Sequence, residues 1–269
     1  MIRVNDVVID STNFPDGTLL MKLPFAVKPS YEIQWYYEND AELFKLICIV
    51  RHLREKYPSA GIDLMMPYLP NARQDRVKNC EDVFTLKYFC EIINSLEFDS
   101  VFVRDAHSNV GLALLDKVIE IRPWGYIEKT IQEIYDNYLP DDDTLMLFYP
   151  DEGAMKRYSS ALNLPFAFGV KRRNWETGMI EGLDLMGNVE AINGKDVLII
   201  DDICSKGGTF YYSAKALKEA GAANIYLYIT HCENTIHEGE LLKKDSLIKE
   251  IFTTDSILTK THEKITIVN

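Results

Sequence analysis

The stretch DVLIIDDICSKGGTF, residues 196–210, joins a hydrophobic segment of strand type to a glycine-rich turn. Asp201 and Asp202 end the hydrophobic run, and two glycines and a threonine at 207–209 then open a segment of helical pattern. In parallel α/β sheets, ligands bind beyond the carboxyl ends of the strands, where the following helix presents backbone N–H groups. The stretch therefore predicts a parallel α/β fold with a ligand site at this turn.

The residue types in this turn indicate the kind of ligand. Glycine lets a backbone approach a ligand closely, Thr209 supplies a hydroxyl, and the helix dipole favours an anion such as phosphate. The carboxylates of Asp201 and Asp202 suit instead the hydroxyls of a sugar or a divalent metal. Together they predict a phosphorylated sugar as ligand. A strand end capped by aspartate before a glycine turn has the same spacing, so spacing alone leaves a purely structural interpretation open.

Composition and charge bound the function. The chain has 269 residues, 47% of them hydrophobic, which is enough for one large or two modest cores. The net charge of -12 argues against a nucleic-acid partner. The five cysteines show neither disulfide nor zinc spacing, so reduced thiols in a cytoplasm are expected. The apolar runs are too short to span a bilayer, so no membrane association is expected.

The order of the expected elements favours two lobes. From residue 40 onward, strand-like and helix-like segments alternate, which is typical of an α/β protein with parallel sheets. Before residue 40, the segments RVNDVVID, TLLMKLP and YEIQWYY are interpreted as antiparallel strands. The linker-like LPDDD at 139–143 predicts domains 1–139 and 140–269. We expect two related α/β lobes around a shared cleft.

Several stretches of the chain resemble motifs of one enzyme family. VLIIDDICSKGGT resembles the phosphoribosyl-diphosphate binding motif of type I phosphoribosyltransferases and ribose-phosphate pyrophosphokinases. Further stretches resemble pyrophosphokinase motifs, in family order: FPDG at 14–17, MPYLPNARQDRV at 66–77, RDAHSN at 104–109, YPDEGAMKR at 149–157 and VKRR at 170–173. Several motifs in order are more specific than any one. The chain is therefore similar to the short-form pyrophosphokinases, with two phosphoribosyltransferase-like lobes and a first lobe trimmed at its N-terminus.

The resemblance implies a role for individual residues. The implied ATP-binding residues are Phe14, Asp16, Arg73, Gln74, Arg76 and His107. The implied sugar-phosphate-binding residues are Asp201, Asp202, Ser205, Lys206, Gly207, Gly208 and Thr209. His107 and Asp151 are the implied metal ligands, and Lys171 and Arg173 the implied catalytic cations. Phe14 is equally consistent with a core residue, and Asp151 with a helix N-cap.

The sequence pattern around Lys171 and Arg173 also favours a functional role for them. The basic cluster at 171–173 stands out in an acidic chain, and strand alternation would place Lys171 and Arg173 on one side. The segment 174–188, NWETGMIEGLDLMGN, is interpreted as a flap over them.

The implied reaction is the transfer of a diphosphoryl group from Mg-ATP to the anomeric hydroxyl of ribose 5-phosphate, with release of AMP. Mg²⁺ is the expected cofactor, small molecules are the expected partners, and a homo-oligomer is expected.

The sequence also departs from the family pattern. Thr18 replaces a glutamate after FPDG, residues 79–84 differ from the usual loop, and Ser205 and Lys206 occupy the sugar-phosphate loop where the family has Asp-Thr. The more positive loop suits a 5-diphosphate, so ADP-ribose, leading to NAD salvage, is an alternative acceptor. The residues also leave open a type I phosphoribosyltransferase and a non-catalytic regulatory homologue.

Overall fold

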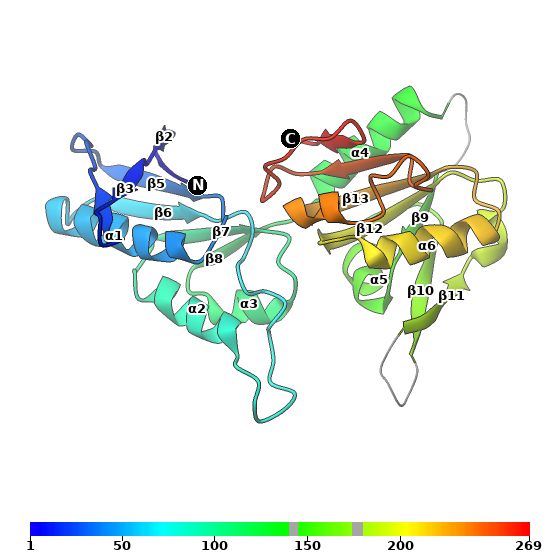
Figure 1. Ribbon diagram of the computed structural model, residues 1–269, viewed down its shortest axis with the longest axis horizontal. Coiled ribbons are helices and arrows are strands. Elements are labelled where there is room, and N and C mark those ends of the chain that lie inside the picture. The colour runs from blue at the N-terminus through cyan, green and yellow to red at the C-terminus, as the bar shows by residue number, and fades with distance from the viewer. Residues whose placement is uncertain (140–144, 174–179) are drawn as a thin grey trace. The chain divides into compact units, whose positions relative to one another are not determined.

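The computed structural model describes residues 1–139, 145–173 and 180–269, with side chains except at 171–173, 180 and 181. These residues form two compact units, Met1–Arg122 (unit 1) and Pro123–Asn269 (unit 2) (Figure 1). Each unit contains its own mainly parallel sheet. The α/β class with two parallel-sheet lobes is thus confirmed.

The two units meet one helix earlier in the chain than the boundary predicted after residue 139. Helix α4 (Trp124–Asn137) belongs to unit 2 because Ile127 and Ile134 are fully buried in a hydrophobic cluster of that unit, together with Leu145. The LPDDD stretch therefore lies inside unit 2, and residues 140–144 are outside the described part.

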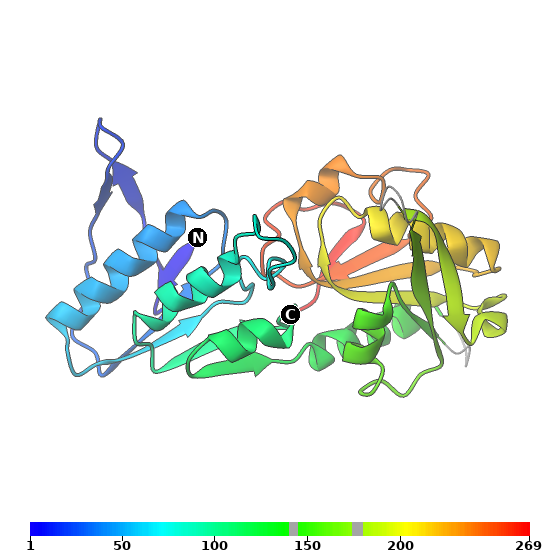
Figure 2. The ribbon, with the colours of Figure 1, turned by 90° about the horizontal axis from the view of Figure 1, so that it is seen from below.

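Unit 1 is a six-stranded sheet in the order β2-β1-β5-β6-β7-β8. Its strands are β1 (Ile2–Val4), β2 (Val7–Val8), β5 (Ser30–Trp35), β6 (Gly61–Met65), β7 (Ser100–Arg104) and β8 (Val118–Ile121). The helices α1 (Ala41–Lys56), α2 (Thr85–Asn94) and α3 (Asn109–Leu114) connect the four parallel strands β5 to β8. Right-handed crossovers between strands that follow one another in a sheet place their helices on one face, as Figures 1 and 2 show.

A polar side chain stabilises the start of helix α1. The side chain of Asn39 accepts a hydrogen bond from the Ala41 N–H at 3.1 Å, which satisfies one N–H at the helix start. Leu46, Ile49, Val50 and Leu53 are buried, and Leu43 and Ile47 are partly buried. This spacing is that of one helical face, which faces the core of unit 1.

The segment before residue 40 differs in part from its prediction. The strands β1 and β2, and the separate hairpin of β3 (Ser11–Asn13) and β4 (Leu19–Met21), are antiparallel as predicted. Strand β5 was predicted antiparallel, but it pairs antiparallel only with β1 and is parallel to β6. The alternation in YEIQWYY predicts a strand with one buried face but carries no information on the direction of its neighbour.

Unit 2 is a seven-stranded sheet in the order β11-β10-β9-β12-β13-β14-β15, in which β11 is the antiparallel strand. Its strands are β9 (Met146–Tyr149), β10 (Phe166–Arg173), β11 (Ile180–Gly187), β12 (Val197–Cys204), β13 (Ile225–Cys232), β14 (Glu250–Thr253) and β15 (Ile265–Ile267). Its other elements are α5 (Glu152–Tyr158), η1 (Val189–Ile192), α6 (Gly208–Glu219) and η2 (Asn234–Glu238). Residues 180–187, predicted as part of a flap, form the regular strand β11, while residues 174–179 lie outside the described part.

The strand order of unit 2 reverses next to β9. The chain leaves β9 for β10 on one side and later returns to β12 on the other side of β9. A reversal of this kind leaves a crevice at the carboxyl ends of the two strands, because the helices that follow them pack on opposite faces of the sheet. Phe210, Ala214 and Leu217 of α6 belong to one buried cluster, and Ala154 and Tyr158 of α5 to another.

Candidate active site

The predicted sugar-phosphate loop, residues 205–209, follows β12 at this reversal of strand order. Gly207 has φ +80°, a left-handed conformation that favours glycine, and is the N-cap of α6. No side chain caps this helix, and its first turn contains no acidic residue. Because the first N–H groups of a helix need acceptors, the start of α6 has the electrostatics of a phosphate site.

Asp201 and Asp202 lie in the carboxyl-terminal half of β12. The Asp202 carboxylate is buried and lies 3.2 Å from the Arg157 guanidinium of α5. Asp201 accepts a hydrogen bond from the Asp202 N–H at 3.0 Å. Desolvation, then the negative charges of Asp202 and Asp151, raise the pKa of Asp201 well above 3.8. A cation or a hydroxyl donor would relieve this repulsion.

Asp151 follows β9, the strand next to β12. Its side chain accepts a hydrogen bond from the Ala154 N–H at 3.1 Å and caps α5, so the N-cap interpretation is confirmed. Its charge also contributes to the raised pKa of Asp201. The sequence therefore brings Asp151, Asp201 and Asp202 to the carboxyl ends of two adjacent strands, as the strand-end prediction requires.

Arg157 is a site residue that the sequence analysis missed. It lies within the quoted YPDEGAMKR motif, but a cation in the last turn of a helix is usually explained by the helix dipole. Its guanidinium instead approaches the Asp202 carboxylate and lies 5.7 Å from the centre of the Tyr158 ring. The only hint in the sequence is that Arg157 ends the motif YPDEGAMKR. Nothing in the sequence links that motif to Asp202, which lies on another strand.

Four of the predicted ATP-binding residues of unit 1 lie on loops after two adjacent parallel strands. Arg73, Gln74 and Arg76 lie in the segment between β6 and α2, which extends as a long loop in Figure 1. His107 follows β7. A β-carbon built on Gly111 of α3 would lie 2.5 Å from the Leu69 side chain, so glycine permits α3 to pack closely against the loop after β6.

Asp75, which the sequence analysis also missed, joins these two loops. Its buried carboxylate accepts two hydrogen bonds from Arg76, at 2.6 and 3.0 Å, and one from the side chain of Ser108. Ser108 in turn caps α3 by accepting from the Val110 N–H at 3.3 Å. The hydrogen bond of Arg76 is the main reason that the pKa of Asp75 lies below 3.8. Asp75 thus holds Arg76 beside the segment that carries His107.

Asp75→Asn is expected to raise the KM for ATP about tenfold, because an amide cannot hold the guanidinium with two charge-assisted hydrogen bonds. The lowered pKa stabilises the fold above pH 3.8, and this contribution is lost as the pH falls through the folded-state value. Urea unfolding should therefore show a less stable variant at pH 7 and no deficit at a pH below the folded-state pKa. The exposed Asp116→Asn is the control. Equal KM values for the two variants would contradict the role of Asp75.

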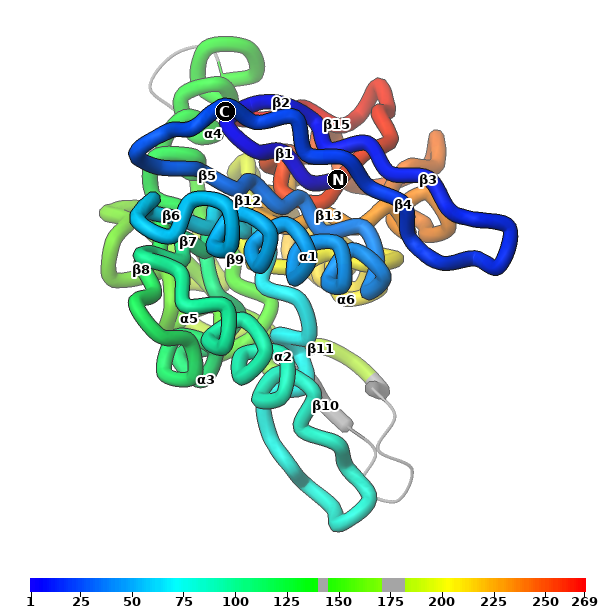
Figure 3. The backbone as a smooth tube through the Cα atoms, turned by 90° about the vertical axis from the view of Figure 1, so that its left-hand side faces the viewer, coloured from blue at the N-terminus to red at the C-terminus, as the bar shows by residue number. Residues whose placement is uncertain are grey.

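Phe14 and Asp16 lie at the tip of the β3–β4 hairpin, which projects from unit 1 (Figures 2 and 3). Phe14 is 48% exposed, so the interpretation as a core residue is wrong. Asp16 accepts hydrogen bonds from the backbone and hydroxyl of Thr18, at 3.0 and 2.7 Å, which lower its pKa. Thr18, the departure from the family pattern, therefore stabilises the turn.

Lys171 and Arg173 lie in the last residues of β10, but their side chains are outside the described part. The pairing of β10 with β11 shifts register between Arg172 and Arg173. The alternation argument for these two cations therefore stays a prediction.

Lys206 is paired within its own unit. Its ammonium lies 2.9 Å from the Glu238 carboxylate, and this pairing lowers the pKa of Glu238. The extra positive charge predicted for the sugar-phosphate loop is thus offset by Glu238. This pairing weakens the argument for a 5-diphosphate ligand.

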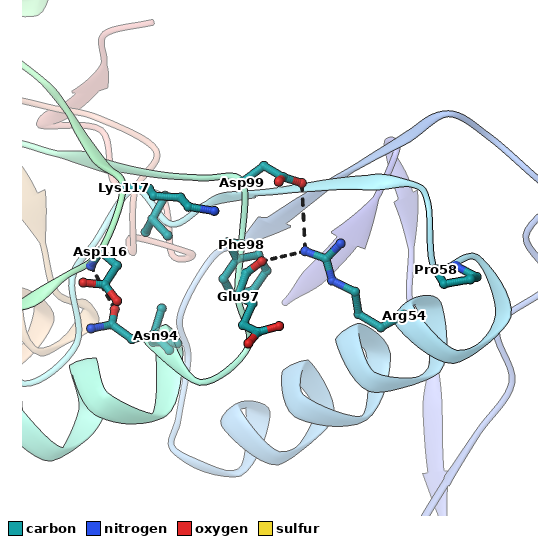
Figure 4. A pocket seen from close by; sticks show the side chains of 10 residues that line it. Arg54, Pro58, Asn94, Glu97, Phe98, Asp99, Asp116 and Lys117 are labelled. Carbon is teal, nitrogen blue, oxygen red and sulfur yellow. Dashed lines mark hydrogen bonds and ion pairs between the residues drawn. The ribbon is translucent and has the colours of Figure 1, made fainter.

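A cavity of about 500 Å³ in unit 1 is unrelated to these residues (Figure 4). It lies at the amino ends of β6 and β7, opposite the loops described above. Arg54 in its wall donates to the carbonyl oxygens of Ala60 and Glu97 and lies 3.9 Å from Asp99. Arg54 thus links segments that precede the strands β6 and β7. None of the predicted site residues lines the cavity.

The carboxylates near Asp201 do not form a complete metal site by themselves. Among the described residues, no three His, Cys, Asp or Glu side chains form a cluster suited to a metal ion. Mg²⁺ is commonly held by one or two carboxylates together with substrate oxygens and water, so Asp151 and Asp201 remain suitable ligands.

No described helix is both long and apolar enough to cross a bilayer.

Unit 2 resembles a known class of domain. Residues 151–264 match the model of the phosphoribosyl transferase domain, so unit 2 contains a domain of this class.

Over nearly its whole length the chain is similar in sequence to ribose-phosphate pyrophosphokinases. It is 29% identical to the ribose-phosphate pyrophosphokinase of Pyrococcus abyssi, over 98% of this chain and 89% of the relative. It is also 29% identical to ribose-phosphate pyrophosphokinase 1 of Listeria innocua, over 91% of this chain and 76% of the relative. The structure of phosphoribosylpyrophosphate synthetase from Mycobacterium smegmatis has the same fold, with a TM-score of 0.78 and 20% identity over 98% of this chain and 87% of that one. The resemblance inferred from the motifs is confirmed.

Proposed function

We propose that the protein is a ribose-phosphate diphosphokinase, which transfers the diphosphoryl group of ATP to the anomeric hydroxyl of ribose 5-phosphate and releases AMP. The observation that carries the proposal is the pair of strand-end sites, one in each unit. Unit 2 presents carboxylates and an uncapped helix start, and unit 1 presents arginines and a histidine on loops joined by Asp75. A phosphoribosyltransferase acting on an existing phosphoribosyl diphosphate would need only the first.

On the sugar side, each group has a role that fits its chemistry. The N–H groups from Ser205 to Thr209 and the start of α6 bind the 5-phosphate. Asp201 and Asp202 accept hydrogen bonds from the ribose 2- and 3-hydroxyls and fix the direction of the anomeric hydroxyl. Arg157 holds the Asp202 carboxylate in its orientation.

On the ATP side, Arg73 and Arg76 bind the triphosphate, and Gln74 and His107 orient it. The side chain of Gln74 accepts a hydrogen bond from the Thr85 hydroxyl at 3.0 Å, which ties the loop to α2. Lys171 and Arg173 stabilise the charge that develops on the transferred phosphates.

Magnesium is the cofactor that the donor set fits best. The mutual repulsion of Asp151 and Asp201 is the observation that supports it, because carboxylate oxygens are the ligands that Mg²⁺ prefers. Asp151 and Asp201 would hold the ion on the sugar side and His107 would assist on the ATP side. When bound, the ion would neutralise negative charge on the phosphates.

Phe14 is proposed as an aromatic platform for the adenine ring, supplied to the site of a second subunit. Phe14→Ala is expected to raise the KM for ATP about tenfold, since base stacking on an aromatic side chain contributes ~1–3 kcal/mol. The melting temperature should change little, because about half of the Phe14 side chain is exposed. Val27→Ala removes another exposed apolar side chain of unit 1 as the control. A variant with an unchanged KM for ATP would refute the platform.

The proposed setting is a cytoplasmic homo-oligomer. All five cysteines are free thiols, which fits a reducing compartment. The exposed tip of the β3–β4 hairpin fits a contact with a second copy.

The acceptor is tested by incubating the protein with Mg-ATP and either ribose 5-phosphate or ADP-ribose. We expect AMP and a diphosphorylated sugar with ribose 5-phosphate, because the relatives described above are ribose-phosphate pyrophosphokinases and Glu238 offsets the charge of Lys206. Product from ADP-ribose alone would overturn this acceptor. Absence of AMP with either would overturn the proposed reaction.

A further inference from the structure

The segment after β13 packs directly against the sugar-phosphate loop. Strands β12 and β13 are parallel and in register to their ends, where Cys204 aligns with Cys232. The pairing continues one residue further, because the Glu233 N–H donates to the Cys204 carbonyl at 2.8 Å. Residues 234–241, here called the support segment, therefore run beside residues 205–208.

Two glycines allow the two segments to approach this closely. A β-carbon built on Gly239 would overlap the carbonyl oxygen of Lys206 and lie 2.9 Å from its carbonyl carbon. Gly239 has φ -101°, which any residue adopts, so only the close approach requires glycine there. A β-carbon on Gly207 would lie 2.6 Å from Leu241 Cγ. Each segment thus occupies the space that a side chain on the other would need.

The support segment is itself held in place. Ile236 and Leu241 are buried in the core on the α6 face of the sheet. The side-chain oxygen of Asn234 accepts hydrogen bonds from the N–H groups of Thr259 and Lys260, both at 3.1 Å. Because one end is tethered and the apolar side chains are buried, the support segment limits the conformations of the loop that it contacts.

The support segment also sets the charge of the loop. Glu238 ends η2 and lies 2.9 Å from the Lys206 ammonium. Both side chains are more than half exposed, so the pair is weak and its charges remain accessible to a ligand. Glu238 acts on a phosphate bound at 205–209 in two ways: it attracts Lys206 and it repels the phosphate itself.

We propose that the support segment determines the affinity of the sugar-phosphate loop for the 5-phosphate, with Gly239 fixing the loop backbone and Glu238 moderating its positive charge. This inference rests on the proposed function, since it assumes that residues 205–209 bind the 5-phosphate of the acceptor. Gly239 and Glu238 are positioning residues, and neither is assigned to the reacting atoms.

The test is isothermal titration calorimetry of ribose 5-phosphate, with steady-state kinetics alongside. Gly239→Ala is expected to weaken binding at least tenfold and to raise the KM for ribose 5-phosphate equally, while the KM for ATP stays unchanged. Glu238→Gln is expected to tighten binding about two- to threefold, with an effect that disappears at high salt. Glu240→Gln is the matched control, because Glu240 lies in the same segment but pairs with Lys243 at 2.7 Å.

The double variant Lys206→Gln/Glu238→Gln separates the two actions of Glu238. If Glu238 acts through Lys206, the gain from Glu238→Gln should shrink when Lys206 is already glutamine. Wild-type affinity in Gly239→Ala, or equal affinities in Glu238→Gln and Glu240→Gln, would overturn the inference. If Gly239→Ala fails to fold, the comparison of the two glutamate variants decides.

Failure of the proposed function would look different. A wild-type protein that neither binds ribose 5-phosphate nor forms AMP contradicts the function itself. A wild-type protein that binds it, with variants that bind equally well, contradicts only the role of the support segment.

Discussion

Asp201→Asn is expected to reduce kcat/KM for ribose 5-phosphate about a thousandfold, equivalent to ~4 kcal/mol of transition-state stabilisation. The amide loses the charge that would bind a cation and accept strongly from a ribose hydroxyl. The same substitution is expected to stabilise the fold at neutral pH. Desolvation and the charges of Asp202 and Asp151 make the ionised carboxylate unfavourable in the folded protein. The site would then retain a destabilising group for its function.

The difference in stability between Asp201→Asn and the wild type should depend on pH. Since the pKa of Asp201 is raised on folding, its favourable contribution is fully present below 3.8 and is lost as the pH rises through the folded-state pKa. Thermal unfolding in EDTA should therefore show an advantage of Asp201→Asn that grows from pH 4 upward. Asp245→Asn, the same change at an exposed position of unit 2, is the control. A variant less stable than wild type at pH 8 would contradict the explanation.

Arg157→Ala is expected to cost about 3 kcal/mol of unfolding free energy, because it leaves the buried Asp202 carboxylate without its cation. The value of kcat/KM for ribose 5-phosphate should fall about a hundredfold, because a misplaced Asp202 no longer orients the ribose. Arg157→Lys keeps the charge and should recover part of both losses. The measurements are urea unfolding and steady-state kinetics with ribose 5-phosphate.

The neighbouring residue supplies a matched control for Arg157. Lys156 is on the same helix, but it is 71% exposed and lies 3.2 Å from Glu152 at the surface. Lys156→Ala should change stability by less than ~1 kcal/mol and leave the kinetics intact. If Arg157→Ala behaved like Lys156→Ala, Arg157 would have no part in positioning Asp202.

The location in the fold could be predicted for those candidate residues whose position follows from local pattern. Asp151 and His107 come just after the hydrophobic strands β9 and β7, and Asp201 follows the hydrophobic run of β12 within that strand. Parallel strands bring their carboxyl ends to one edge of a sheet. The glycine turn at 207 likewise predicts the start of α6.

The residues that were missed act through partners distant in the chain. Arg157 meets Asp202, Asp75 meets Ser108, and Glu238 meets Lys206. No periodicity or spacing links such pairs, because the contact exists only after the strands between them have paired. The direction of β5 relative to β6 was missed for the same reason.

The most direct test of the proposed reaction uses ATP labelled at the β-phosphorus. With magnesium and ribose 5-phosphate, diphosphoryl transfer predicts that the label leaves the nucleotide completely and appears in a diphosphorylated sugar, with one unlabelled AMP formed per sugar product. A label that stays in ADP would indicate transfer of a single phosphoryl group. That result would contradict the proposed function.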